Sequence, residues 1–143
     1  MRTHETHARL IEQLISLGGV VTSMTKAIVE ADDLTESQAN LLWLVDPDAE
    51  PVSLKQLAGR LQCDPSNVTL LSAKLEEKGL ALRAPHPADG RVRTLLLTDA
   101  GAKVRKRLLA RAYARSPFAT LEGKEQQQLH RLLDKVLTAQ AER

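Results

Sequence analysis

The sequence has few of the residues that catalysis, metal binding or base stacking would need. Four scattered histidines and one cysteine, Cys63, provide no metal-ligand set and no intramolecular disulfide bond. We find no Ser/His/Asp set, no glycine-rich phosphate loop and no close pair of carboxylates, so we expect no enzyme, no cofactor and no metal. Aromatic residues make up 2% of the chain, too few for the platforms on which single-strand readers stack bases: Trp43, Tyr113 and Phe118.

Long apolar runs are also absent. No uninterrupted run approaches the roughly eighteen apolar residues that span a membrane, and no signal peptide is visible at the N-terminus. We therefore expect no membrane partner, and the single cysteine favours the reducing cytoplasm as the location. A chain of 143 residues, 43% of them hydrophobic, can form one domain with its own core, or one domain with an appended helical part.

The net charge of +2 hides an asymmetry along the chain. Residues 1–52 carry 3 Lys or Arg against 9 Asp or Glu, whereas residues 53–97 carry 7 against 4 and residues 98–120 carry 6 against 1. The remaining residues, 121–143, carry 4 of each. The positive charge therefore lies in the middle of the chain, where a polyanion would bind. Many soluble proteins have charged halves, so the asymmetry alone does not decide the function.

Residues 53–97 predict a helix-turn-helix followed by a β-hairpin. Helical spacing of apolar residues ends at Gln62, and Asp64 with Pro65 begins a second helix as N-cap and first helical residue. Gly79 follows that helix as a left-handed C-cap. Two strands, 81–85 and 91–97, flank the turn sequence HPADG. This order of elements presents a helix that fits the major groove of duplex DNA.

Helices are expected on both sides of this module. The first runs from about residue 4 to residue 31, and two more cover about 98–116 and 121 onward. Capping boxes at Thr35 and Ser53 begin the helices in between. The predicted fold class is therefore mainly α with a small β-wing. The terminal helices carry wide apolar faces, and little else in the chain could cover them.

Three segments, in this order and spacing, resemble the MarR family of bacterial transcriptional regulators. They are LTESQANLLWL at 34–44, LKQLAGRLQCDPSNVTLLSAKLEEKGL at 54–80 and ADGRVRTLLLTDAG at 88–101. Residues 121–136, LEGKEQQQLHRLLDKV, also suit the last helix of the family. Each segment alone is weak evidence because winged helices are common, whereas their order and spacing together are specific.

The resemblance implies a homodimer that binds double-stranded DNA at a palindromic operator and regulates transcription, with repression favoured over activation. The first helix and the last two would interlock in the dimer. The chain then divides into an N-terminal dimerisation helix at 1–33, a winged helix-turn-helix DNA-binding domain at 34–98 and C-terminal dimerisation helices at 99–143.

An effector is the second implication of the resemblance. Family members often bind anionic aromatic compounds between the dimer helices and the winged helix, so we expect a small aromatic or anionic effector that releases the DNA. No residue pattern identifies this effector. We assign Trp43 to the core rather than to such a pocket.

The second helix of the helix-turn-helix is the predicted DNA-reading element. Serine and threonine hydroxyls can bond phosphate or base acceptors, an asparagine amide can pair with adenine, and a lysine suits phosphate. The family often has arginine where this chain has Leu70, which argues against guanine readout there and leaves contact with a thymine methyl. The alternative is an ordinary exposed polar face. The residues that lie off the inward face are Ser66, Asn67, Thr69, Leu70, Ala73 and Lys74.

Asp89 and Arg91 match the D-x-R motif of the family's wing. The resemblance implies that Arg91 reaches a narrow minor groove, where the potential is most negative. Asp89 would hold Arg91 or a neighbouring turn by a charge-assisted hydrogen bond and would not touch DNA. Arg93, two residues further along the strand, supports the same surface. The alternative is an exposed pair worth less than about 1 kcal/mol.

Other interpretations stay open. A winged helix used for protein contact, with DNA binding lost, is the alternative function, and Leu70 and the modest net charge favour it. Cys63 is interpreted as a small buried turn residue rather than a redox switch. One basic run either adds DNA contacts or, as we prefer, forms a solvated helix face that pairs with the partner's acidic first helix: Lys103, Arg105, Lys106, Arg107, Arg111 and Arg115.

Overall fold

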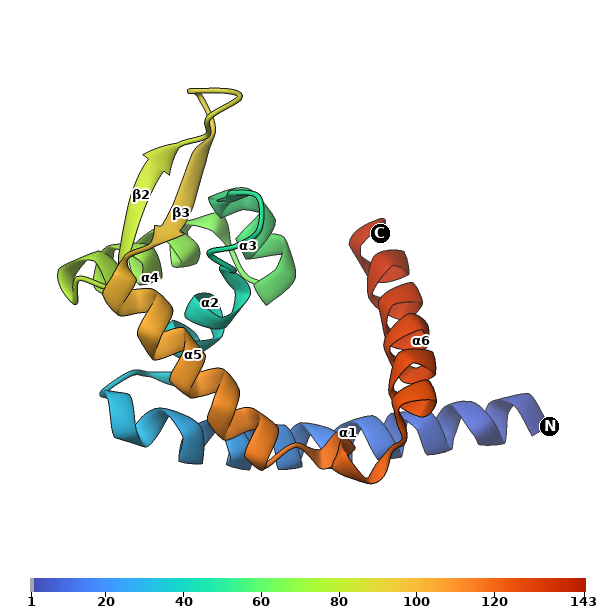
Figure 1. Ribbon diagram of the computed structural model, residues 1–143. Helices are drawn as coiled ribbons and strands as arrows, with labels where there is room; N and C mark the ends of the chain where they lie inside the picture. The colour runs from blue at the N-terminus through green and yellow to red at the C-terminus, as the bar shows by residue number, and fades with distance from the viewer. Residues whose placement is uncertain (1) are drawn as a thin grey trace.

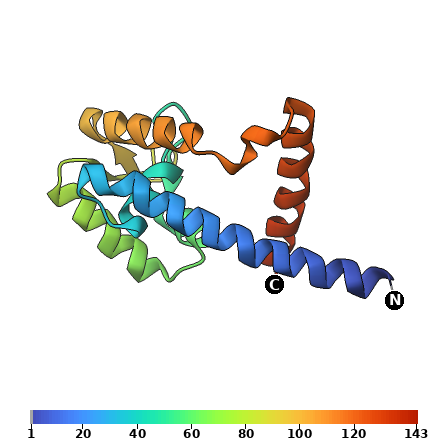
Figure 2. The same cartoon turned by 90° about the horizontal axis from the view of Figure 1, so that it is seen from below.

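The computed structural model describes residues 2–143 and confirms the mainly helical fold with a small β-wing (Figure 1). A central lobe holds α2, α3, α4 and the sheet, α1 crosses below the lobe and extends past it, and α6 stands apart (Figure 1, Figure 2). The elements are α1 (Arg2–Val29), η1 (Glu30–Asp32), α2 (Glu36–Leu44), β1 (Val52–Ser53), α3 (Leu54–Leu61), α4 (Pro65–Glu77), β2 (Ala81–Pro85), β3 (Arg93–Leu97), α5 (Asp99–Ala114), η2 (Pro117–Thr120) and α6 (Gly123–Ala141).

The sheet is antiparallel, with the strand order β1-β3-β2. β2 and β3 pair from Ala81↔Leu97 to Pro85↔Arg93 and form the predicted hairpin. The second strand of the hairpin begins at Arg93 rather than at residue 91, because residues 86–92 form the turn. The two-residue strand β1 was not predicted, since two residues are too few to show an alternating pattern; it pairs with Leu95 and Thr94 of β3.

The predicted capping signals match the helix ends of the lobe. Thr35 and Ser53 both form complete capping boxes. Asp64 is the N-cap of α4, although its side chain makes no capping hydrogen bond, and Pro65 begins the helix. Gly79 adopts a φ of +72°, the left-handed conformation that a residue with a side chain rarely takes.

An apolar core fills the centre of the lobe. Val68 and Leu75 of α4 face this core, as predicted, and are fully buried. The other large apolar side chains that are fully buried come from α2, α3, β3 and α5: Leu41, Leu42, Leu57, Leu95 and Leu108. Burial of one such side chain stabilises the fold by roughly 1.5–3 kcal/mol. This layer therefore fixes α4 against the rest of the lobe.

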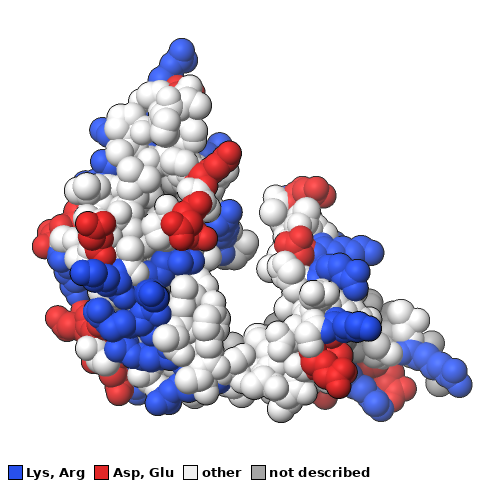
Figure 3. Space-filling view, viewed as in Figure 1, with Lys and Arg blue, Asp and Glu red and all other residues white. Residues whose placement is uncertain are grey.

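The terminal helices bury little of their apolar surface. α1 buries only Ile28 and Val29, and α6 buries no residue. Figure 3 shows uncharged surface in the lower middle of the molecule, between the lobe and α6. Contiguous apolar surface of this kind marks an interaction site. The exposed apolar residues are Leu10, Ile11, Leu14, Ile15, Leu17, Val20 and Val21 on α1, and Leu132, Leu133, Val136 and Leu137 on α6.

The ends of the terminal helices differ slightly from the prediction. α1 gives way after Val29 to the 3-10 turn η1, so the first α-helix does not reach residue 31. α6 begins at Gly123 rather than at residue 121, because Glu122 and Glu125 form a capping box in which each side chain accepts from the other residue's backbone N–H.

The stretch Arg2–Asp32 is long and apolar enough to cross a membrane by length and composition alone. The sequence analysis missed this property because polar residues interrupt the apolar runs. The stretch also contains seven charged residues: Arg2, Glu5, Arg9, Glu12, Lys26, Glu30 and Asp32. Ile28 and Val29 of this stretch are packed in the core of the lobe. One end of α1 is therefore part of the lobe, and the rest of the helix exposes apolar residues. This arrangement is typical of a helix that contacts a protein partner.

Gly101 allows α5 to touch the segment that follows α4. The Thr98 backbone N–H donates to the Leu80 carbonyl at 3.1 Å, and the Thr98 hydroxyl donates to the Gly79 carbonyl at 2.7 Å. A Cβ atom on Gly101 would lie 1.9 Å from the Leu80 carbonyl oxygen, which is backbone and cannot move alone. This close approach therefore requires glycine at position 101.

Gly101→Ala should destabilise the fold by about 3 kcal/mol, because the added methyl group forces α5 away from Leu80. The control is Gly59→Ala, since Gly59 lies inside α3 with nothing within 4 Å of the added methyl. That change should stabilise the helix by up to about 1 kcal/mol. Urea unfolding followed by circular dichroism measures both effects. Equal stability of Gly101→Ala and the parent would contradict the assigned contact.

Candidate nucleic-acid interface

The predicted reading residues lie together on the outer face of α4, hereafter the recognition helix. Leu70 has 59% of its surface exposed, a large fraction for an apolar side chain on a lobe with a well-formed core. Thr69 is partly engaged, because its hydroxyl donates to the Pro65 carbonyl at 3.1 Å and keeps its acceptor capacity. Lys74 lies 3.6 Å from Glu77 in a weak surface pair. The exposed set is Ser66, Asn67, Thr69, Leu70 and Lys74.

The wing turn is built around Asp89. Its carboxylate accepts a hydrogen bond from the Arg91 backbone N–H at 3.1 Å, and its carbonyl accepts from the Val92 N–H at 3.0 Å. The His86 carbonyl accepts from the Asp89 N–H at 3.2 Å and closes the turn. The aspartate therefore holds the backbone of the turn, one of the two contacts considered for it, and leaves the Arg91 guanidinium exposed. Basic side chains stand at the tip of the wing (Figure 3).

Arg93 is the first residue of β3 and pairs with Pro85, so it lies where the strands of the wing meet the turn. It lines a hollow between the recognition helix and the sheet together with Leu54, Thr69, Glu76 and Arg83. The structure thus brings Thr69 and Arg93, two predicted site residues, to one surface. Arg91 lies in the turn of the hairpin, so the predicted residues form one cluster on α4 and the start of β3 and one separate group in the wing turn.

Glu76 and Arg83 tie the wing to the recognition helix. Arg83 donates to both carboxylate oxygens of Glu76, from Nε at 3.2 Å and from Nη2 at 3.1 Å, and its backbone N–H donates at 2.6 Å. These hydrogen bonds, with the charges of Arg83 and Arg93, hold the pKa of Glu76 below its usual value. Sequence reasoning missed this pair because no helical or strand periodicity links positions 76 and 83.

The basic run on α5 makes contacts within its own chain. Arg105 donates to the Trp43 carbonyl at 3.0 Å, so it contacts α2 of its own chain. Arg107 and Arg111 both bind Asp32, at 2.9 Å and 2.5 Å. Three arginines of this run therefore contact their own chain, which was not expected. Arg107 is still 50% exposed, and the pairing of this face with a partner's first helix stays a prediction.

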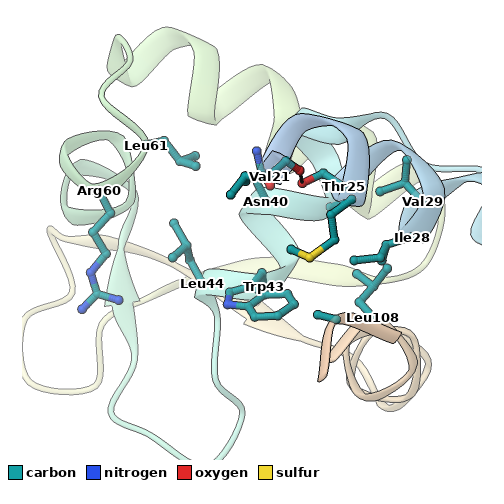
Figure 4. Close-up of a pocket in the computed structure, with 13 residues that line it drawn as sticks. Val21, Thr25, Ile28, Val29, Asn40, Trp43, Leu44, Arg60, Leu61 and Leu108 are labelled. Atoms are coloured by element: carbon teal, nitrogen blue, oxygen red, sulfur yellow. Dashed lines mark hydrogen bonds between the residues drawn. The ribbon is translucent and has the colours of Figure 1, made fainter. Parts of the chain in front are cut away.

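An apolar cavity lies where α1 and α5 meet the lobe. Its volume is about 300 Å³, and its walls come from α1, α2, α3 and α5. Trp43 is 36% exposed and lines this cavity, so its assignment to the core is wrong. Figure 4 shows the Trp43 ring between Arg60 and Leu108, with Leu44 and Leu61 on the α3 side. Arg60 is the cavity's one charged lining residue among those described.

Comparison with known proteins agrees with this geometry. Residues 34–92, which reach from the start of α2 into the wing turn, match the sequence model of the MarR family. The structure superposes with a TM-score of 0.78 on CouR from Rhodococcus jostii RHA1, solved bound to p-coumaroyl-CoA, at 26% identity and over 87% of this chain and 89% of CouR. Over residues 34–92 the chain is similar to the MarR family. This match, together with the structural likeness to CouR, supports a transcriptional regulator of the winged-helix type.

One further relative bears on the class of protein, and one further solved structure bears on the fold. The HTH-type transcriptional repressor IacR of Pseudomonas putida is 26% identical over 125 residues, which cover 86% of this chain and 74% of IacR. A MarR-family regulator from Listeria monocytogenes, solved in complex with a 26mer DNA, shares the fold at a TM-score of 0.73 and 16% identity, over 90% of this chain and 89% of that one. The match to the family model includes Asp89 and Arg91 and stops before Arg93.

Arg91→Ala should weaken duplex binding at least about tenfold with little change in melting temperature, because its guanidinium is exposed and contributes no packing. Arg115→Ala removes an equal charge at the end of α5 and should change the affinity less than about twofold. Fluorescence anisotropy with a labelled duplex measures both affinities. An unchanged affinity of Arg91→Ala would exclude the wing tip from the interface.

Proposed function

We propose that this chain is a cytoplasmic, homodimeric repressor that binds a palindromic operator through one recognition helix per half-site. The observation that carries the proposal is the joint exposure of the polar face of α4 and a basic wing on one lobe. A helix presented by a helix-turn-helix enters the major groove, and two-fold related copies read half-sites about 10 bp apart. IacR, a relative named as a repressor, supports repression as the mode of regulation.

The reading residues divide by their chemistry. Asn67 would pair with an adenine edge, the Ser66 and Thr69 hydroxyls would bond base or phosphate acceptors, and Leu70 would contact a thymine methyl. Lys74 and Arg93 would bind phosphates on either side of the groove, and Arg91 would enter the minor groove. Asp89 supports Arg91 through the backbone of the turn. The positions contribute no catalytic chemistry, which fits a regulator rather than an enzyme.

A homodimer is supported by the terminal helices. Apolar residues of α1 and α6 lie 42–70% exposed in the single chain, from Leu17 to Ile15. Exposure of this extent is costly in water, and a symmetric second copy would cover the same faces on both chains. The division into dimerisation helices at 1–33 and 99–143 and a DNA-binding domain at 34–98 follows from this proposal. If a second chain covers the apolar faces of α1 and α6, no membrane is needed to cover them.

The exposed Leu70 favours one alternative, a winged helix that contacts protein after losing DNA binding. An apolar side chain in the middle of a reading face would suit a protein surface as well as a thymine methyl. The two functions differ in their dependence on salt, because only DNA binding releases condensed counterions.

The effector we propose is a small aromatic acid held in the cavity beside Trp43. A cavity of about 300 Å³ lined mainly by apolar side chains suits one aromatic ring, and Arg60 offers a partner for its carboxylate. CouR, bound to p-coumaroyl-CoA, is a relative with an aromatic acyl ligand. Because α3 forms one wall of the cavity and leads directly into the recognition helix, occupancy would shift the reading face and release DNA.

Duplex affinity should fall about 10³-fold between 50 mM and 200 mM salt. Lys74, Arg91 and Arg93 from two chains would neutralise about six phosphates, and each releases counterions. Anisotropy titrations on duplexes selected from a random pool measure the slope of log affinity against log salt. An affinity that does not change with salt would contradict DNA binding and support the protein-contact alternative.

The cavity should bind p-coumarate or benzoate and should bind the matching uncharged amides at least about tenfold more weakly. Arg60→Met should remove this preference for the acid, since Arg60 supplies the positive charge. Lys55→Met is the control, because Lys55 lies on the same helix and does not line the cavity. Isothermal titration calorimetry measures the affinities. Equal affinity for acid and amide in the parent would overturn the proposed effector class.

A further inference from the structure

Asp32 lies at the junction of three parts of the molecule, and sequence reasoning gave it no role beyond ending a helix. It is the last residue of η1, the turn between α1 and α2, and its side chain is 9% exposed. A buried carboxylate is costly unless each oxygen has a partner. The contacts of Asp32 are therefore informative about what this turn does.

Both oxygens of Asp32 are bound by α5. Oδ1 accepts from Arg107 at 2.9 Å and 3.3 Å, and Oδ2 accepts from Arg111. Arg111 also donates to the Ile28 carbonyl near the end of α1, at 3.0 Å. Burial alone would raise the pKa of Asp32, but the hydrogen bonds from Arg111 and Arg107 hold it below its usual value. Arg107 and Arg111 are four residues apart and lie on the same face of α5. Together they hold η1 at one position along α5 and on one side of it.

The opposite side of the same turn is bound by the recognition helix. Asp33 is left-handed, with φ 51° and ψ 46°, and its carbonyl accepts a hydrogen bond from Lys78, the C-cap of α4. Lys78 also donates to the Gln38 side chain at 3.3 Å. The same Gln38 oxygen accepts from the Thr35 backbone in the capping box that begins α2. The turn thus joins α5 directly to the C-terminal end of the recognition helix.

A small change at this end is magnified at the reading face. Ser66 and Asn67 lie in the first turn of α4, about 18 Å from Lys78 by the 1.5 Å rise per residue of an α-helix. A tilt of about 10° at Lys78 would move them by about 3 Å, close to the 3.4 Å between successive base pairs. The angle of the recognition helix would therefore determine, to within about one base pair, the distance between the half-sites that the dimer accepts.

We infer that Asp32 is a positioning residue that sets the angle between the recognition helix and the dimer helices, and through it the operator half-site separation that the dimer accepts. The inference rests on the proposed function, since it needs a dimer on DNA. In this inference Arg107 and Arg111 do not contact DNA. They affect which operators the dimer accepts by holding Asp32 and with it the angle of the recognition helix. Two properties of the operator would then be recognised by different residues. The α4 side chains would read the half-site sequence, and the contacts of Asp32 and Asp33 would set the accepted distance between half-sites.

The test is selection from a duplex pool with 30 randomised base pairs. The parent should enrich inverted half-sites at one separation at least about tenfold over separations one base pair shorter or longer, and Asp32→Asn should lower that ratio to about threefold or less with the half-site sequence unchanged. Asp48→Asn, the same charge change on an exposed loop residue, should keep the ratio of the parent. Sedimentation equilibrium checks that each variant stays dimeric.

Lys78→Gln provides a second variant that leaves the buried carboxylate and its arginines in place. It should broaden the accepted separations in the same way, and it decides the matter if Asp32→Asn does not fold. A folded dimer of either variant that keeps the single separation of the parent would overturn the inference while leaving DNA binding intact. A parent that enriches no paired half-sites would overturn the proposed function itself, and the inference with it.

Discussion

Leu80 follows the recognition helix and precedes the wing, and its carbonyl oxygen accepts a hydrogen bond from Thr98 while α5 passes directly over it at Gly101. This contact holds the C-terminal end of α4 against the start of α5. Lys78 adds a bond from the same end to the turn before α2. Both contacts link the end of the recognition helix to the helices around it, and the wing begins directly after Leu80.

The terminal helices impose the second constraint. Their apolar faces are exposed in one chain, so the fold as a monomer leaves unfavourable surface in water. In the proposed dimer, a symmetric partner would relieve this cost and would at the same time place two recognition helices on one duplex. The exposed face, the junction at Asp32 and the cavity beside Trp43 all border α1 or α5. The proposed dimer face, the proposed effector site and the junction that orients the recognition helix are therefore adjacent, as the proposed ligand-controlled regulation requires.

Much of the fold could be predicted from local signals. Capping boxes at Thr35 and Ser53, the Asp64-Pro65 start and the left-handed Gly79 act within a few residues, and the sequence displays them directly. The exposed residues of α4 could be predicted from the buried positions on its other face. An unbroken apolar run is a poor guide to the hydropathy of α1. The mean hydropathy over a window of the helix is high enough for a membrane span even though polar residues interrupt the apolar ones.

The contacts that orient the elements could not be predicted in this way. Asp32 and Arg107 are 75 positions apart, and Glu76 and Arg83 belong to different kinds of element. A charged residue on a helix gives no local sign of its partner, so the α5 arginines were taken for a solvated face. Trp43 was placed in the core because tryptophan usually is, whereas a cavity beside it leaves part of its ring accessible.

The central claim is that two chains bind one duplex with two-fold symmetry, and hydroxyl-radical footprinting combined with native mass spectrometry tests it most directly. On a duplex that the protein selects, we predict the mass of two chains per duplex and two protected regions centred about 10 bp apart. One chain per duplex, or a single protected region without a symmetry mate, would contradict the account.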